Sequence, residues 1–379
     1  ATIDGTIAIG YQALNALTSG ANNTAIGYQA GDVITTSGNN TIVGKSAMGS
    51  TLATGCNYNV AIGTEALGGS WTGSASTHNT AVGTFAMDDA MDGALRNVAM
   101  GYGSMGSLTT GDDNTAIGYL SLLSCATGAN NTCIGSLSGD AITGANDCVS
   151  LGYFSLSAAA TQTGTVAIGS AALAALTSGA GNTAVGYKSL YTSEANGDAC
   201  TAVGYEAMLT FNADADGHGE NTAVGYKAMR GTTTGVQSTA VGTWALGGAS
   251  TTGDSNTAIG YNSGQGITSG QDNVLVGAAS GDALTTGSEN VAIGLNALGQ
   301  HDTGARNIAI GYLAMNDTGH HADTRASTDN VFVGNTAGGG DWQSNDSNKN
   351  VGIGNYVMDG AMNAANSNTA LGHSALSAL

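Results

Sequence analysis

The sequence predicts an all-β protein, a parallel β-solenoid (a β-roll) of about 21 coils with a modal repeat of 17 residues. One glycine-centred motif returns 21 times along the chain, and eleven of the twenty intervals between these glycines are 17 residues. Small and aliphatic residues alternate in front of each glycine. The composition, with 61 glycines, no proline and 5% aromatic residues, suits backbones stacked closely around a thin core. Such a period decides the fold before any other motif, because each repeat buries its core against its neighbours.

The motif begins with a three-residue segment that has the pattern of a short strand. The position three before the glycine is always Thr, Val or Ile, and the position one before it is always Ile, Val, Leu or Met. Between them stands Ala in 15 of the 21 copies, as in Thr24-Ala25-Ile26. Period-two alternation with β-branched residues is typical of a strand. We expect the β-branched and aliphatic side chains to fill the inside of the coil and the Ala to face outward, towards a second backbone.

The residues after the glycine predict a second short strand or arc and then a turn. Tyr follows the glycine in ten copies, Ala or Ser stands three residues after it in twenty, and Leu, Met or Gly comes next. Thr/Ser/Gly turns such as 18–20 close the coil. Coils stacked at about 4.8 Å would give a rod of roughly 100 Å.

Asparagine stands four residues before the glycine in 16 copies. Stacking places these residues above one another, so we expect a ladder of Asn side chains that hydrogen-bond to each other and to the turn backbone. Consecutive tyrosines such as Tyr187, Tyr205 and Tyr226 are expected to stack in the same way. Both rows are interpreted as stacking devices rather than as binding rows.

The motif predicts a single continuous domain over residues 1–379, because it covers the chain without a break. All longer inserts fall after the second arc and before the Asn. Insertions at one edge of a solenoid decorate one face, which is therefore the best candidate for outside contacts. These inserts lie near 68–78, 87–96, 211–220, 316–329 and 338–349.

The charge balance excludes two classes of partner. Eight Lys and Arg against 27 Asp and Glu give a net charge of −19, which opposes binding to nucleic-acid phosphates and to anionic lipid. No apolar run approaches the roughly 18 residues of a membrane helix, so no membrane insertion is expected. The first residues have neither Met nor a signal-peptide pattern, which predicts a processed chain or a fragment. The five cysteines do not share a single repeat register and are interpreted as small buried hydrophobic residues.

No catalytic residue and no cofactor is predicted, because the six histidines pair with no Ser or Cys at a recurring register. Asp214, Asp216 and Glu220 alternate around a glycine as in a calcium loop. They lack the full twelve-residue spacing, so a solvated acidic turn is the favoured interpretation of this low-ranked calcium site.

Two further groups are candidate ligand sites. His320, His321 and Asp323 could hold a transition metal. Trp71 and Trp342 lie in inserts, where exposed aromatic rings could stack on sugars, although packing beneath the insert is favoured.

The core Asn-Thr/Val-Ala-Ile/Val-Gly resembles the head repeat of trimeric autotransporter adhesins of the YadA kind. The longer unit Asn-Thr-Ala-Ile-Gly-Tyr-x-Ala-Leu, followed by Thr-Ser-Gly, is closer still to arrays in phage tail-fibre and related surface-fibre proteins. The resemblance covers essentially the whole chain. It implies a left-handed parallel β-roll, three chains side by side, and an attachment fibre outside the cell, at its surface or on a virion.

Two function classes stay open. The favoured one is a structural fibre for attachment, since the acidic residues are scattered over different inserts. The other is a glycan-binding or carbohydrate-active solenoid that uses the insert face. Joined end to start, the chain would continue the 17-residue spacing, as 7 + 10 residues. This predicts head-to-tail stacking of subunits, with a window of a longer fibre as the rival explanation.

Overall fold

The computed structural model describes residues 4–50, 54–71, 73–158, 163–192, 198–212, 219–316, 326–340, 342 and 346–378. The chain divides into two compact units, Ala1–Val185 and Gly186–Leu379. The same coil builds both units. The described residues form strands and turns and no helix, which confirms an all-β parallel solenoid of about 20 turns with a spacing of about 17 residues.

Each coil contributes one three-residue strand directly before its glycine. In unit 1 these are β1 (Ile7–Ile9), β2 (Thr24–Ile26), β3 (Thr41–Val43), β4 (Val60–Ile62), β5 (Thr80–Val82), β6 (Val98–Met100), β7 (Thr115–Ile117), β8 (Thr132–Ile134), β9 (Val149–Leu151), β10 (Val166–Ile168) and β11 (Thr183–Val185). In unit 2 they are β12 (Thr201–Val203), β13 (Thr222–Val224), β15 (Thr239–Val241), β17 (Thr257–Ile259), β18 (Val274–Val276), β19 (Val291–Ile293), β20 (Ile308–Ile310), β21 (Val331–Val333), β22 (Val351–Ile353) and β23 (Thr369–Leu371).

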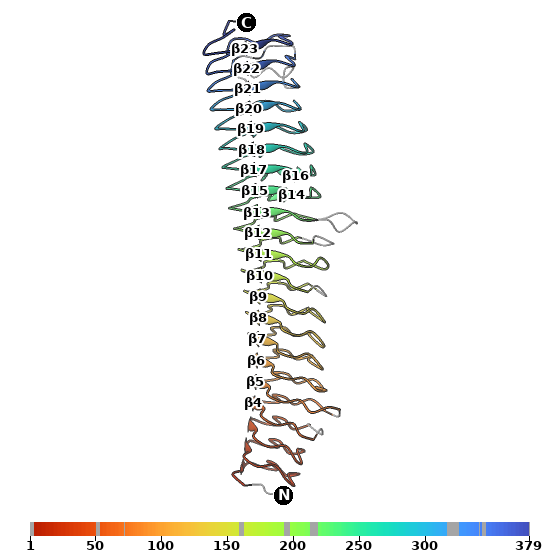
Figure 1. Ribbon diagram of the computed structural model, residues 1–379. Helices are drawn as coiled ribbons and strands as arrows, with labels where there is room; N and C mark the ends of the chain where they lie inside the picture. Colours follow the sequence, from red (N-terminus) through yellow and green to blue (C-terminus); the bar gives the residue numbers. More distant parts are fainter. Residues whose placement is uncertain are drawn as a thin grey trace. The chain divides into compact units, whose positions relative to one another are not determined.

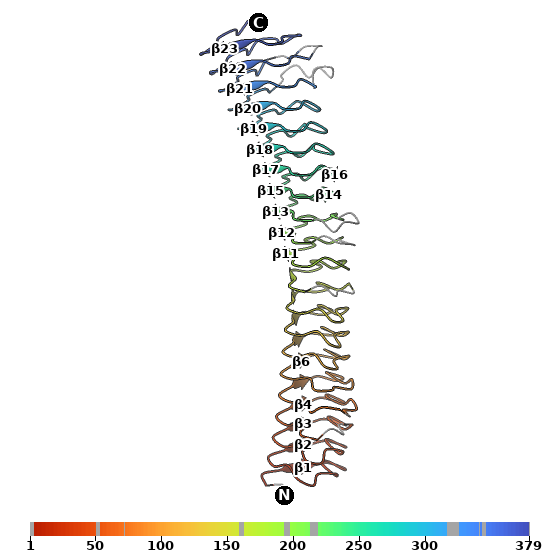
Figure 2. The same cartoon turned by 45° about the vertical axis from the view of Figure 1, so that its right-hand side comes forward.

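Within each unit, a strand pairs in parallel with the strand of the next coil, and equivalent residues of the motif lie side by side. In β7 and β8, for example, Thr115 pairs with Thr132 and Ile117 with Ile134. The strands of each unit stack along one side, and the loops project on the other (Figures 1 and 2). Two further short strands, β14 (Gly231–Thr232) and β16 (Ala249–Thr251), lie on these loops and pair with each other.

The inward and outward faces of the strands are exchanged relative to the expectation from the sequence. The central Ala25 and Ala116 are fully buried, whereas the flanking Ile26 is 39% exposed. Ala therefore faces the inside of the coil, and the β-branched and aliphatic residues face outward. The interior is too narrow for two large side chains at each level, because the strand packs directly on the turns that follow the glycine.

The narrow core is filled by complementary volumes. Where a large residue replaces the inward Ala, a glycine of the same or the preceding coil stands in place of the usual Leu or Met four residues after a repeat glycine. A Cβ on Gly31 would lie 2.9 Å from Cδ1 of Ile42, and a Cβ on Gly338 would lie 2.8 Å from the ring of Phe332. Large residues paired with glycine keep the volume close to that of Ala paired with Leu, as close packing requires.

The segment after the glycine is an arc of linked turns rather than a second strand. Gln12 and Leu14 both have positive φ, 55° and 52°, although neither is glycine. Hydrogen bonds from Ala13 N to Gly10 O and from Asn15 N to Gln12 O, both 3.3 Å, close two successive turns. Left-handed backbone costs about 1–2 kcal/mol for an ordinary residue. Hydrogen bonds between coils offset this cost, for instance from Leu14 N to Ala30 O at 3.0 Å.

The repeat glycines are required by the distance between coils. Gly118 has a φ of +140°, and a Cβ on it would lie only 2.3 Å from the carbonyl oxygen of Gly135 in the next coil. No residue with a side chain fits there without moving the backbone. The stack of glycines therefore sets how closely consecutive coils approach.

The predicted asparagine ladder is confirmed, and it lies inside the coil. Asn114 Oδ1 accepts hydrogen bonds from the backbone N and the Nδ2 of Asn131, both at 3.0 Å. Its own Nδ2 donates to Asn97 Oδ1 at 3.1 Å and to Gly128 O at 2.8 Å. The buried amide of Asn114 thus joins three consecutive coils and satisfies a loop carbonyl that water cannot reach.

Candidate functional site

Of the predicted metal ligands, Glu220 alone lies among the residues that the structure describes. Asp214 and Asp216 lie outside the described residues, as do His320, His321 and Asp323. Glu220 is exposed, and its Oε2 accepts a hydrogen bond from Gln237 Nε2 at 3.0 Å. The described residues contain no cluster of three or more His, Cys, Asp or Glu side chains that could hold a metal ion. The calcium site stays a prediction.

The structure places Trp71 and Trp342 inside the protein. Both side chains are fully buried. Trp342 Nε1 donates a hydrogen bond to Gly338 O at 2.7 Å, and its ring meets Phe332 edge-on at 6.0 Å between centroids. A ring without solvent exposure offers no face to a sugar, so these contacts agree with packing beneath the insert, the interpretation that the sequence favours.

The five cysteine side chains are buried, as the sequence predicts. Burial raises the pKa of Cys125 and of Cys200 to about 11. A thiol with such a pKa is almost entirely protonated at neutral pH, and only the thiolate attacks electrophiles or binds metals well. These side chains are part of the core.

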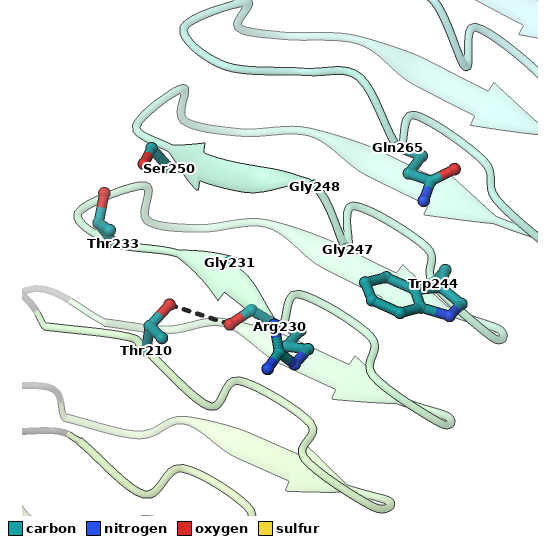
Figure 3. Close-up of a pocket in the computed structure, with 9 residues that line it drawn as sticks. All are labelled: Thr210, Arg230, Gly231, Thr233, Trp244, Gly247, Gly248, Ser250 and Gln265. Atoms are coloured by element: carbon teal, nitrogen blue, oxygen red, sulfur yellow. Dashed lines mark hydrogen bonds between the residues drawn. The ribbon is translucent and has the colours of Figure 1, made fainter.

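The third tryptophan, Trp244, lines an open groove on the loop side of unit 2 (Figure 3). Trp244 stands two residues after the repeat glycine Gly242, where the chain is variable and the side chain points out of the coil. The groove has a volume of about 490 Å³. It is lined by Thr210, Arg230, Gly231, Thr233, Trp244, Gly247, Gly248, Ser250 and Gln265.

The backbone of the loops forms the floor of this groove. Strands β14 and β16 pair in parallel with a register shift after Gly231, and Thr233 N donates to Thr251 O at 2.9 Å. A Cβ on Gly247 would lie 2.8 Å from Cε3 of Trp244. Glycine at this position lets the indole lie against the backbone and fixes the ring at the edge of the groove.

A small charged cluster adjoins the tryptophan. Arg230 Nε donates to Glu206 Oε2 at 2.8 Å, and Lys227 Nζ lies 3.9 Å from the same oxygen. Lys227 Nζ is also 4.9 Å from the centroid of the Trp244 ring, close enough for a cation–π contact. The hydrogen bond from Arg230, helped by a hydrogen bond from Tyr205 and the nearby cations, lowers the pKa of Glu206, so this carboxylate is charged at neutral pH.

A second surface of interest is the outer face of the strands, which we call the sheet face. It consists of the first and third residue of each strand together with the tyrosines that follow the glycines. The predicted tyrosine stacking is confirmed, with ring centroids 5.2 Å apart for Tyr187 and Tyr205 and 5.4 Å for Tyr205 and Tyr226. Large apolar residues exposed on this face include Ile26, Ile62, Met100 and Ile134 in unit 1 and Val224, Val241, Ile259, Ile293 and Ile353 in unit 2.

The length of the inserts does not predict the Trp244 groove, because Trp244 stands in the coil itself and not in one of the longer inserts. Its position carries polar residues such as Gln29 and Lys188 in some coils and apolar residues such as Phe85 and Leu120 in others. Residue type at this position is therefore only a weak signal of a binding surface.

The chain matches no protein-family model, no curated protein and no solved structure. The family resemblance of the repeat therefore stays a prediction. Over the residues that the structure describes, no helix has the length and apolarity that crossing a bilayer needs. The sheet face and the Trp244 groove are the two candidate contact surfaces among the described residues.

Proposed function

We propose that the chain is a non-enzymatic structural component of an extracellular fibre, at a cell surface or on a virion, that serves attachment. The observation that carries this proposal is the sheet face. Its apolar side chains recur in register from coil to coil, as at Ile26, Ile62 and Ile134 in unit 1. Monomeric soluble proteins rarely expose contiguous apolar patches beyond a few hundred Å². A face this regular is best explained as one that another chain covers.

The partner that fits is a second and third copy of the same chain. Only a surface with the same spacing along its length matches an apolar row that repeats once per coil. Three copies around an axis would each bury their sheet face and leave their loops outward. This arrangement agrees with the left-handed trimeric β-roll that the resemblance implies. In this arrangement the outward aliphatic residues contact the neighbouring chain, the role expected of Ala, since the Ala residues lie inside.

Head-to-tail growth is the second part of the proposal. Strand β1 pairs with β2 through one edge, and β23 pairs with β22 in the same way. A further coil with the same motif could pair with the remaining edge, whether it belonged to another copy or to the same polypeptide. Exposed strand edges are templates for such pairing.

The mass of the purified protein in solution tests the trimer. We expect three chain masses by sedimentation or native mass spectrometry. The double variant Ile134→Lys, Ile293→Lys places a charge on the sheet face of each unit and should shift the mass to that of one chain. Thr127→Lys, on an exposed turn of the loop side, is the matched control and should leave the trimer intact. A wild-type protein that stays monomeric at micromolar concentration contradicts the proposal.

The extracellular location needs a separate experiment. Antibodies raised against the chain should label intact source cells or intact virions without permeabilisation. Labelling that appears only after lysis would contradict a surface fibre.

A further inference from the structure

We propose that the Trp244 groove binds an acidic oligosaccharide, a chain of pyranose rings that carry carboxylates. The inference rests on the proposed attachment function and gives the chemical class of what the fibre would attach to. Trp71 and Trp342 are buried, so Trp244 is the tryptophan that a ligand in a groove can reach.

The aromatic part of the site is Trp244. Its side chain is half-buried, and the indole lines the groove (Figure 3). The backbone of Gly247 lies against the indole on one side, and Lys227 Nζ lies 4.9 Å from the ring centroid. A ring fixed in this way loses little entropy on binding, and it offers an apolar platform to the C–H face of a sugar.

The cationic part of the site is Arg230. Its ion pair with Glu206 uses Nε, and the planar guanidinium can present its terminal nitrogens to a carboxylate as a bidentate donor. Arg230 and Lys227 against Glu206 leave a local charge of +1, in a chain whose net charge is −19. This local positive charge on the wall of the groove favours an anionic ligand over a neutral one.

The remaining walls carry neutral hydrogen-bonding groups. Figure 3 shows Thr210, Thr233 and Ser250 on the side of the groove opposite Trp244 and Gln265, with the glycines between them. Thr210 Oγ1 is anchored by its bond to Arg230 O at 2.9 Å. Hydroxyl and amide groups around an aromatic ring match the alternating hydroxyls and C–H surfaces of a sugar. The volume of about 490 Å³ lies within the usual range of ligand sites, about 300–1,000 Å³.

The test is a titration of the full-length protein with hexagalacturonate, followed by calorimetry and by tryptophan fluorescence. Trp71 and Trp342 are buried, so a ligand-dependent change in fluorescence reports on Trp244. We expect saturable binding that weakens as salt is raised, because partly exposed charges are screened. Fully methyl-esterified hexagalacturonate keeps the rings and loses the charge, and it should bind at least about tenfold more weakly.

Matched variants locate the site. Arg230→Gln should weaken hexagalacturonate binding at least about tenfold and leave the esterified ligand unaffected. Trp244→Asn should abolish binding of both ligands, and it suits the backbone because Asn262 occupies the same position in the next coil with a similar positive φ. Arg306→Gln removes an arginine paired with Asp329 in another coil and should change nothing. Circular dichroism must show that each variant is folded.

Three outcomes would overturn the inference: no binding to the wild-type protein in the millimolar range, equal affinity for the charged and the esterified ligand, or binding that survives Trp244→Asn. None of them affects the trimer measurement. Conversely, a monomeric protein that binds hexagalacturonate through Arg230 would refute the fibre and leave the groove in place.

Discussion

The strand side and the loop side of each coil differ in how strictly they repeat. On the strand side, each strand pairs with the next strand of its unit without a shift, and the buried Asn114 contacts the same position in the coils before and after it. On the loop side, neighbouring coils differ in length and in residue type, and β14 and β16 pair with a register shift. The side that repeats holds the coils together. The side that varies can place a tryptophan and an arginine in one coil without disturbing the others.

This contrast explains why a groove can exist on so regular a fold. A stacked ladder needs the same residue at the same level in every coil, because each side chain is the partner of the next. A binding site needs the opposite, different side chains converging on one point. The loops of unit 2 around Trp244 provide that difference.

The largest loss of stability is expected when a side chain is added within the stack of repeat glycines. Gly118→Ala would place a Cβ 2.3 Å from the backbone of the next coil, and we expect a loss of at least about 3 kcal/mol in the free energy of unfolding. Gly181→Ala is the control, because its φ is also positive but nothing lies within 4 Å of the added Cβ. It should cost only about 1–2 kcal/mol of backbone strain. Urea denaturation followed by circular dichroism measures both, and equal costs would show that the coils are not packed as closely as described.

The second-largest loss of stability is expected when an asparagine of the buried ladder is replaced. Asn114→Ala removes four hydrogen bonds and leaves Gly128 O without its amide donor. We expect a destabilisation of about 2–4 kcal/mol, since buried polar groups without partners are costly. Hydrogen exchange should accelerate in the coils around residues 97–131.

Asn130→Gly is the control for this variant. Asn130 lies nearby but is exposed, and its Nδ2 bonds Asp147 at 3.1 Å. Glycine accepts the positive φ of 59° at this position, so the change should stay within about 0.5 kcal/mol. An effect as large as that of Asn114→Ala would mean that the buried amides add no special stability.

The smallest change in stability is expected from a half-buried carboxyl group on the loop side. Burial raises the pKa of Asp282 above its ordinary value. The folded state therefore binds this proton more tightly than the unfolded state, and the free energy of unfolding falls as pH rises from the ordinary Asp pKa through the raised value. Asp282→Asn should remove this part of the pH dependence and raise stability at pH 7 by about 0.5 kcal/mol.

Thermal unfolding between pH 4 and pH 7 measures this change. The exposed Asp272 provides the control variant, Asp272→Asn, which should keep the pH dependence of the wild type. If both variants behave alike, the pH dependence comes from the overall negative charge and not from Asp282.

The sequence predicted the period, the strand positions, the Asn ladder and the tyrosine stacks, because each depends on equivalent residues lying above one another. It did not predict which strand face lies inside. Alternation shows that there are two faces, and both faces here are apolar, so the width of the coil decides. The co-occurrence of Ile42 with Gly31 and of Phe332 with Gly338 carried that information, since a large residue matched to a glycine marks an interior position.

The residues of the proposed binding groove were less predictable than the fold. Trp71, Trp342 and Trp244 cannot be distinguished by residue type, and only the packing shows that the first two are buried and the third lines a groove. The pairing of Arg230 with Glu206 joins residues 24 positions apart, across a loop whose length departs from the modal repeat. Spacing alone could not align them.

A cryo-electron microscopy map of the purified protein tests the central claim, that the sheet face is covered by copies of the same chain. We predict three chains that meet through the outward residues of their strands, such as Ile26 and Ile134, with the Trp244 groove open to solvent on each. A single chain whose sheet face is in solvent, or chains that meet through their loops, would contradict it.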